Sequence, residues 1–89
     1  MADLKIDNNQ LASRFEAVVN GRLAILDYRI EEGTIFLLYV EVPEEDQGRG
    51  IASELARVAL EFARNGGLKV VPQCPFIATY MRNHPEELR

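Results

Sequence analysis

The spacing of apolar residues changes at residue 51, and this change predicts strands before that point and a helix after it. From residue 51 the apolar side chains recur every three or four residues, as on one face of a helix. This stripe consists of Ile51, Leu55, Val58 and Phe62. Upstream, apolar residues either alternate with polar ones or run continuously, as in half-buried and fully buried strands. The division predicts an antiparallel β meander followed by helical segments.

Three strands are predicted in the first half, at residues 14 to 19, 22 to 30 and 34 to 42. Asn20-Gly21 lies between the first two and is the strongest short hairpin signal, because both positions of a type I′ turn need positive φ angles. Glu32-Gly33 marks the next turn. Apolar residues of the third strand fall on both of its faces, which predicts a central strand covered on both sides. An additional strand is possible at residues 4 to 7.

The second half is predicted to contain a helix, a short strand and a second helix. The first helix ends at Gly66-Gly67, which supplies a left-handed stop. Residues 68 to 71 form a short buried strand, and its connection through the helix to the third strand fits a parallel βαβ crossover. A second helix over residues 76 to 83 ends before Pro85. The expected fold is α+β in the order βββαβα, with a mixed, mostly antiparallel sheet and two helices.

Length and composition limit the classes of function. With 89 residues and no repeat or linker, residues 1–89 are expected to form a single domain. The net charge of −4 argues against electrostatic nucleic-acid binding, which needs a basic face. Cys74 is the only cysteine, so an intramolecular disulfide and a two-cysteine metal site are excluded, and no metal is expected.

The sequence also predicts a cellular location for the protein. No apolar run approaches the ~20 residues that span a bilayer. The first ten residues have neither the cationic start nor the apolar core of a signal peptide. We therefore expect a cytoplasmic protein that binds neither membranes nor nucleic acids.

The segment QGRGIA, residues 47 to 52, is a candidate phosphate-binding loop. It does not match a P-loop, which needs GxxxxGK followed by Ser or Thr. It also departs from the dinucleotide fingerprint, because position 53 is Ser instead of a third glycine. Glycines directly before a helix let successive N–H groups converge on an anion, and Arg49 adds a positive charge. Taken alone, the loop leaves open a flexible turn without a ligand.

The wider sequence resembles the GNAT superfamily of acyl-CoA-dependent N-acetyltransferases. QGRGIA matches the Q/R-x-x-G-x-G/A signature of that superfamily position for position. The runs EVPEEDQGRGIASELARVALEFAR, GLKVVPQCPFIATY and HPE resemble its minimal one-domain members, over residues 14 to 87. The resemblance implies a three-layer α/β arrangement within the α+β class. It also implies transfer of an acetyl group from acetyl-CoA to an amine, by a monomer or weak homodimer.

The resemblance assigns the coenzyme A contacts residue by residue. The loop amides would bind the pyrophosphate, and these belong to the signature residues Gln47, Gly48, Arg49, Gly50, Ile51 and Ala52, with Ser53 at the helix start. The strand before the loop would pair with the pantetheine arm through Val40, Glu41 and Val42. A non-catalytic module that binds or senses coenzyme A is the alternative to an enzyme.

Two residues are candidates for catalysis. Tyr80 resembles the helix tyrosine that many superfamily members use as general acid, although an amphipathic core residue would look the same. Cys74 precedes the second helix, where a thiol pKa tends to fall; it is either an acetylated nucleophile or a residue that lines the site during direct transfer. A dyad of Cys74 with His84 is not expected, since the helix would separate them by about 12 Å. Glu41 is a possible base, but a solvent-facing strand residue is the commoner case.

The acceptor is not determined by the sequence. Typical superfamily members place two helices between the first two strands and further strands after the second helix, and these build the acceptor pocket. Here Asn20-Gly21 joins the strands directly, and the sequence ends at Arg89. A protruding amine on a protein, a small polyamine or a site completed by a partner all fit.

Overall fold

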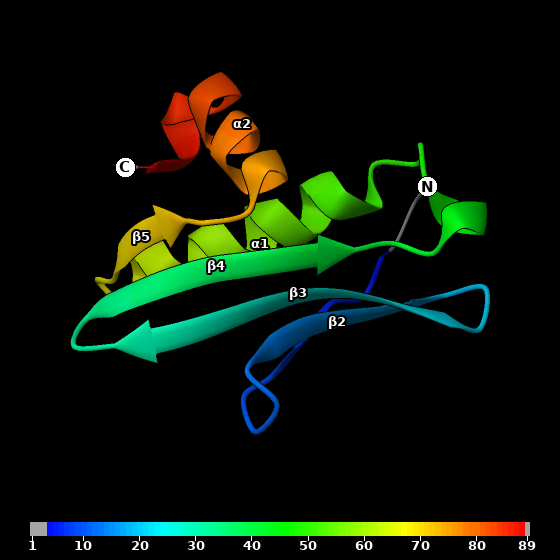
Figure 1. Cartoon of the computed structure of the whole chain (residues 1–89), viewed down its shortest axis with the longest axis horizontal. Helices are drawn as coiled ribbons and strands as arrows, with labels where there is room; N and C mark the ends of the chain where they lie inside the picture. Colours follow the sequence, from blue (N-terminus) through cyan, green and yellow to red (C-terminus); the bar gives the residue numbers. More distant parts are fainter. Residues whose placement is uncertain (1–3, 89) are drawn as a thin grey trace.

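The computed structural model describes residues 4–88 and contains a five-stranded sheet with two α-helices (Figure 1). The elements in order are β1 (Asp7–Asn9), β2 (Arg14–Val19), β3 (Arg22–Glu31), β4 (Thr34–Glu41), the 3₁₀ segment η1 (Glu44–Asp46), α1 (Ile51–Asn65), β5 (Lys69–Pro72), α2 (Pro75–Asn83) and the 3₁₀ segment η2 (Pro85–Leu88). The predicted α+β class and the order βββαβα are therefore confirmed, with β1 as the additional strand.

The sheet is mixed and mostly antiparallel, as predicted. Its strands lie in the order β1-β2-β3-β4-β5, and only the pair β4–β5 is parallel. The parallel pair is connected through α1, since a parallel connection needs a crossover. Asn20 and Gly21 have φ angles of 53° and 76°, so the tight hairpin turn predicted between β2 and β3 is confirmed.

The predicted N-terminal strand exists, but its position was wrong. It lies at Asp7–Asn9 instead of residues 4 to 7, and Asp7 is the first residue that pairs with β2. Leu4 and Ile6 precede it and pack, partly buried, against the core. Their apolar character comes from this packing, which does not require a strand.

The core lies between one face of the sheet and the two helices. Its fully buried sheet residues include Leu26, Ile35 and Leu37, and α1 contributes Leu55 and Ala59. Residues from α2 belong to the same buried cluster, so both helices cover the same face of the sheet (Figure 1). The helical stripe predicted for α1 is confirmed at Ile51 and Leu55, but Val58 and Phe62 are only partly buried. In the second half of the helix the buried residues are Ala59, Leu60 and Ala63.

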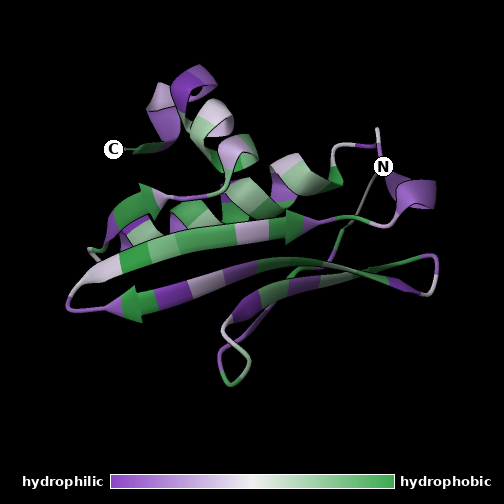
Figure 2. Ribbon diagram, in the orientation of Figure 1, coloured by the Kyte–Doolittle hydropathy of each residue, from purple (hydrophilic) through white to green (hydrophobic). Residues whose placement is uncertain are grey.

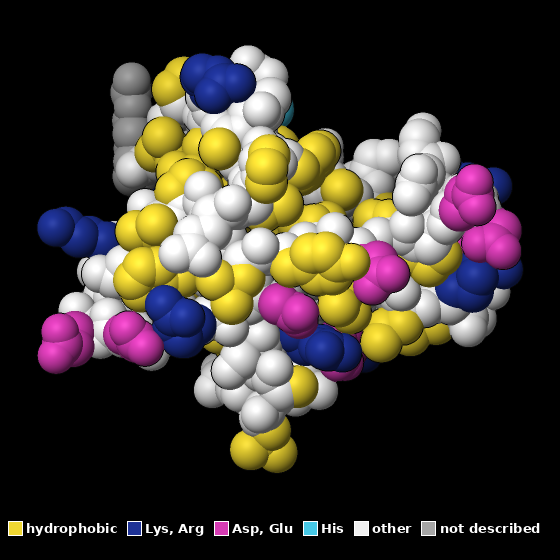
Figure 3. All heavy atoms as spheres, in the orientation of Figure 1, with side chains coloured by type: hydrophobic (Ala, Val, Ile, Leu, Met, Phe, Trp, Pro, Cys, Tyr) yellow, Lys and Arg dark blue, Asp and Glu magenta, His cyan; other side chains and the backbone are white. Residues whose placement is uncertain are grey.

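The layers differ from those expected. β4 is hydrophobic along most of its length (Figure 2), and the space-filling view shows hydrophobic side chains over this part of the surface (Figure 3). Within residues 4–88 the helices cover only one face of the strand. On the other face Phe36 and Leu38 are half-buried and Tyr39 is 49% exposed, and none of them joins the core cluster. The guanidinium of Arg29 lies 4.7 Å from the ring centre of Phe36 and shields part of this face. The described chain therefore has two layers where the resemblance implied three.

Candidate functional site

A bulge in β4 separates this strand from β5. Asp27 of β3 is opposite Tyr39 and Tyr28 is opposite Leu37, so Leu38 is the extra residue. The parallel pairing with β5 reaches only as far as Leu37. In the part of the chain that the structure describes, no strand pairs with the β5-facing edge of β4 beyond this point. A free strand edge presents backbone N–H and C=O groups that can pair with another extended group.

The chain turns sharply where β5 ends. The N–H groups of Gln73 and Cys74 both donate to the backbone oxygen of Leu37, at 3.0 and 3.1 Å. Cys74 is then the N-cap of α2, and Pro75 occupies the first turn, where its missing N–H costs nothing. The two strands thus diverge at Leu37, and α2 begins at the point of divergence.

The glycine loop lies at the end of β4, directly before α1. Gly48 and Gly50 have φ angles of 82° and 81°, in the left-handed region that favours glycine. Gly50 is the N-cap of α1 and supplies no side-chain hydrogen bond to the first turn. The amides at the start of this 15-residue helix therefore carry the positive end of its dipole, about half a charge, and the N-cap residue itself offers them no side-chain acceptor.

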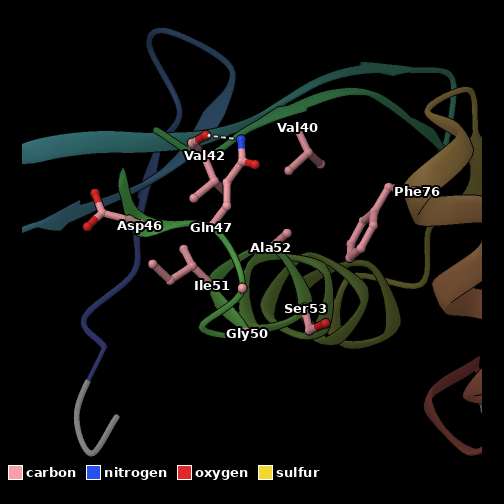
Figure 4. Close-up of a pocket in the computed structure, with 10 residues that line it drawn as sticks. Val40, Val42, Asp46, Gln47, Gly50, Ile51, Ala52, Ser53 and Phe76 are labelled. Carbon is pink, nitrogen blue, oxygen red and sulfur yellow. Dashed lines mark hydrogen bonds between the residues drawn. The ribbon is translucent and has the colours of Figure 1, made fainter. Parts of the chain in front are cut away.

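A groove of about 420 Å³ joins the open edge of β4 to this helix N-terminus. Figure 4 shows the residues that line it: Val40, Val42, Asp46, Gln47, Gly48, Gly50, Ile51, Ala52, Ser53 and Phe76. One end presents loop amides and the other presents aliphatic side chains and the ring of Phe76. The groove therefore fits an elongated ligand with an anionic part and an apolar part.

Eight of the ten residues predicted to bind coenzyme A line this groove, namely Val40, Val42, Gln47, Gly48, Gly50, Ile51, Ala52 and Ser53. Glu41 and Arg49 do not line it, and both are exposed. Glu41 alternates with its neighbours in β4, so its side chain projects from the opposite face of the sheet. The Gln47 side chain donates to the backbone oxygen of Val42 at 3.0 Å and ties the loop to the strand end. Ligand binding by these residues stays a prediction.

Sequence reasoning missed two residues of the groove. Phe76 projects from the first turn of α2 towards Ala52 and is 40% exposed (Figure 4). Asp46 belongs to the run Glu44-Glu45-Asp46, in which nothing in the sequence distinguishes the buried carboxylate from the two exposed ones. Only the fold makes this distinction.

Asp46 is fully buried, and its carboxylate accepts three hydrogen bonds from the β2–β3 hairpin. Asn20 Nδ2 donates at 3.0 Å, and Arg22 donates through Nε and Nη2, both at 3.0 Å. The Arg22 hydrogen bonds, followed by the one from Asn20, hold the pKa of Asp46 below its usual range. The carboxylate is therefore charged at neutral pH and points away from the groove (Figure 4).

The two predicted catalytic residues lie outside the groove lining. Cys74 is 9% exposed and lies where β4 and β5 diverge. Tyr80 is 7% exposed, and its hydroxyl donates to Glu87 Oε2 at 2.8 Å. Burial first, and then the Glu87 carboxylate, raises the pKa of the Tyr80 phenol.

His84 belongs to the end of α2, as expected. Its ring stacks on Tyr80 with ring centres 4.0 Å apart, and Nδ1 lies 2.9 Å from the Tyr80 backbone oxygen. Cys74 caps the other end of the same helix, so the helix length separates the two side chains. Among residues 4–88 there is no group of three or more His, Cys, Asp or Glu side chains that could hold a metal ion. No helix in this range is long and apolar enough to cross a membrane.

Comparison with known proteins identifies relatives over nearly the whole chain. A family model described as GCN5-related N-acetyl-transferase matches residues 14–89. Protein NATD1 of Xenopus tropicalis is 29% identical over 87 residues, which are 94% of this chain and 80% of the relative. Protein NATD1 of Danio rerio is 31% identical over 85 residues, covering 92% and 77% of the two chains.

A solved structure has the same fold. The NMR solution structure of a GCN5-like protein from Staphylococcus aureus superimposes with a TM-score of 0.75. The match covers 98% of this chain and 86% of that one, at 24% identity. The arrangement of sheet and helices described above is therefore shared with a known fold.

Proposed function

The chain belongs to the GCN5-related N-acetyltransferase family, and from this premise we propose that it binds acetyl-CoA in the groove and transfers the acetyl group to an amine. One observation carries the proposal: the open edge of β4 leads directly to the uncapped N-terminus of α1. The two halves of coenzyme A need these two surfaces, since the pantetheine arm pairs with a strand edge and the diphosphate needs converging amides.

The loop fits a diphosphate sterically as well as electrostatically. A Cβ atom added at Gly48 or Gly50 would meet no other atom within 4 Å, so the space over the loop backbone is open. Both glycines have positive φ angles, which lets the loop backbone turn before α1. The apolar lining from Val40, Val42 and Phe76 would cover the pantetheine arm.

Acetyl transfer needs a proton acceptor and a proton donor. The amine nitrogen bonds to the thioester carbonyl carbon, the C–S bond breaks, the amine loses a proton and the departing thiolate gains one. Cys74 and Tyr80 are our candidates for this chemistry. Cys74 has the better position, because it lies where β4 and β5 diverge. Tyr80 would first have to exchange its hydrogen bond with Glu87 for one with the thiolate.

The described chain offers little enclosure for an acceptor. Residues between β2 and β3 form only a tight turn, and the sheet face away from the helices is uncovered within residues 4–88. This supports an acceptor that is itself large, such as an amine protruding from a protein. The same feature favours the alternative of a module that binds acetyl-CoA without turnover.

One experiment decides between turnover and binding alone. The protein is incubated with acetyl-CoA labelled in the acetyl group and with a panel of peptide α-amines, lysine side chains and polyamines. Release of coenzyme A with label on an amine supports the enzyme, and label on Cys74 that chases to an amine supports a covalent route. Binding without release of coenzyme A would contradict transfer and establish the binding module. A Cys74→Ala variant with unchanged turnover would exclude the covalent route.

A further inference from the structure

Asp46 is the one charged residue between residues 4 and 88 with a fully buried side chain. A carboxylate without water is strongly unfavourable unless it is paired and hydrogen-bonded. Here Asn20 and Arg22 supply this pairing, although they precede Asp46 by 26 and 24 residues. The cost of burying the charge is therefore offset only when the β2–β3 turn and the segment before the glycine loop are held together.

The partners are arranged to fix position as well as charge. Arg22 approaches with two nitrogens, Nε to one carboxylate oxygen and Nη2 to the other, so the planar guanidinium sets the orientation of the carboxylate. Asn20 stands in the turn with a φ of 53°, and its side chain bonds the same oxygen as Nη2. The tight turn keeps these donors next to each other at the end of the paired strands β2 and β3.

The glycine loop has few other restraints. Residues 47–50 are exposed, and two of the four are glycines with positive φ. The backbone bonds at the start of the loop are Asp46 N–H to the Pro43 oxygen at 2.8 Å and Gln47 N–H to the Glu44 oxygen at 3.3 Å. A ligand that orders a flexible loop loses affinity by the entropy of ordering it. A fixed residue directly before the loop reduces this loss.

We propose that Asp46 is a positioning residue, through which Asn20 and Arg22 of the β2–β3 hairpin order the glycine loop for an anionic diphosphate. Asp46 is among the residues that line the groove, but its carboxylate points away from it (Figure 4), so we expect its side chain to act through the loop and not on the ligand. The inference rests on the proposed binding of coenzyme A. The β2–β3 turn would thus support coenzyme A binding, although it contributes no wall to an acceptor pocket.

The test compares single and paired substitutions. Arg22→Met removes the two guanidinium donors and leaves only Asn20 beside a buried anion, which would itself repel a diphosphate. The paired variant Asp46→Leu with Arg22→Met removes one charge of each sign, so the net charge stays at −4. Apolar replacement of a whole buried ion pair is often tolerated by the fold. Arg14→Met is the matched control, because Arg14 pairs with Asp27 at 3.2 Å on the same sheet and lines no part of the groove.

Two readouts separate ordering of the loop from general stability. The first is hydrogen exchange at the amides of residues 47–52 in the free protein, and the second is the dissociation constant for coenzyme A by calorimetry. The paired variant is expected to exchange faster in the loop and to bind coenzyme A about tenfold more weakly, which corresponds to about 1.4 kcal/mol. The Arg14→Met variant is expected to leave both unchanged. Arg22→Lys, which loses the bidentate fork, is the second variant if the pair does not fold, and is expected to give a smaller loss.

The outcomes are distinct. Wild-type affinity and wild-type loop exchange in a folded paired variant would overturn the proposal. Recovery of affinity in the paired variant but not in Arg22→Met would mean that charge alone, and not loop order, was responsible, which also overturns it. If the wild-type protein binds no coenzyme A, the proposed function fails, whereas faster loop exchange in the variant would still support ordering by Asp46.

Discussion

The backbone N–H of Cys74 donates to the backbone oxygen of Leu37 at 3.1 Å, and this bond marks the point at which β5 leaves β4. Before it the strands are paired, and beyond it no strand among residues 4–88 pairs with this edge of β4. The bulge at Leu38 contributes, since the extra residue bends the strand locally. The position of the groove therefore follows from a single change in strand pairing.

The first prediction concerns Gly50. Its φ of 81° is strained for any residue with a Cβ, and an added Cβ would lie in the open space over the loop. Gly50→Ala is expected to destabilise the fold by about 1–2 kcal/mol and to weaken coenzyme A binding by about tenfold or more. Gly33→Ala is the matched control, because Gly33 has a φ of 79°, similarly open surroundings and a place in the β3–β4 turn. Equal coenzyme A affinity in the two variants would mean that the glycine loop is not part of the binding site.

The second prediction concerns Phe76. Its ring lines the apolar end of the groove while remaining 40% exposed, so removing it should cost more in ligand binding than in stability. Phe76→Ala is expected to raise the dissociation constant of acetyl-CoA about threefold to tenfold, or about 0.7–1.4 kcal/mol. Phe36→Ala provides the comparison, since Phe36 lies on the sheet face away from both helices. A larger loss of affinity in Phe36→Ala would mean that the pantetheine arm binds on the sheet face away from both helices, which contradicts the proposed groove.

A third prediction follows from the buried carboxylate of Asp46. Arg22 and Asn20 favour its charged form and lower its pKa, so the stabilisation is present above the unfolded pKa of about 3.9. It is lost as the pH falls through the lower folded pKa. Asp46→Asn should therefore be less stable than wild type at neutral pH, with a difference that narrows below about pH 4. Urea unfolding from pH 7 to pH 2 measures this difference, and a constant gap would contradict the ion pair.

The fourth prediction concerns Tyr80 at high pH. Burial and the Glu87 carboxylate favour the neutral phenol and raise its pKa, so the folded state holds the proton longer than the unfolded state. This contribution is complete below the unfolded pKa of about 10 and is lost as the pH rises above it. Tyr80→Phe should lose less stability than wild type between about pH 9 and pH 11. Thermal unfolding across this pH range measures the loss in each protein. Parallel losses would mean that the phenol pKa of Tyr80 is not raised in the folded state.

Much of the architecture could be predicted because its signals are local. Asn20-Gly21 specifies a turn through the φ angles it permits, and the change of period at residue 51 locates the start of α1. The glycine loop was located by the same means, since its two glycines and the helix that follows are adjacent in sequence. Local chemistry is sufficient for these elements.

The rest depends on contacts between distant segments. The burial of the Asp46 carboxylate depends on its pairing with Arg22 of the β2–β3 hairpin, and the hydrogen bond from Tyr80 to Glu87 depends on how η2 folds back. The apolar run of β4 indicated two covered faces, but it could not show whether an element of this chain covers the second. The shifted strand β1 has the same origin, because Leu4 and Ile6 pack without pairing.

The most direct test of the central claim is a titration of isotope-labelled protein with coenzyme A, followed by NMR at the backbone amides. Binding in the groove predicts the largest shifts in two places, the loop at residues 48–52 and the open edge of β4 at residues 38–42. The second cavity, lined in part by Leu60, Leu68 and Met81, should change little. Shifts centred on that cavity would contradict coenzyme A binding at the glycine loop. So would the absence of shifts at about 1 mM coenzyme A, the upper end of the usual range of KM values.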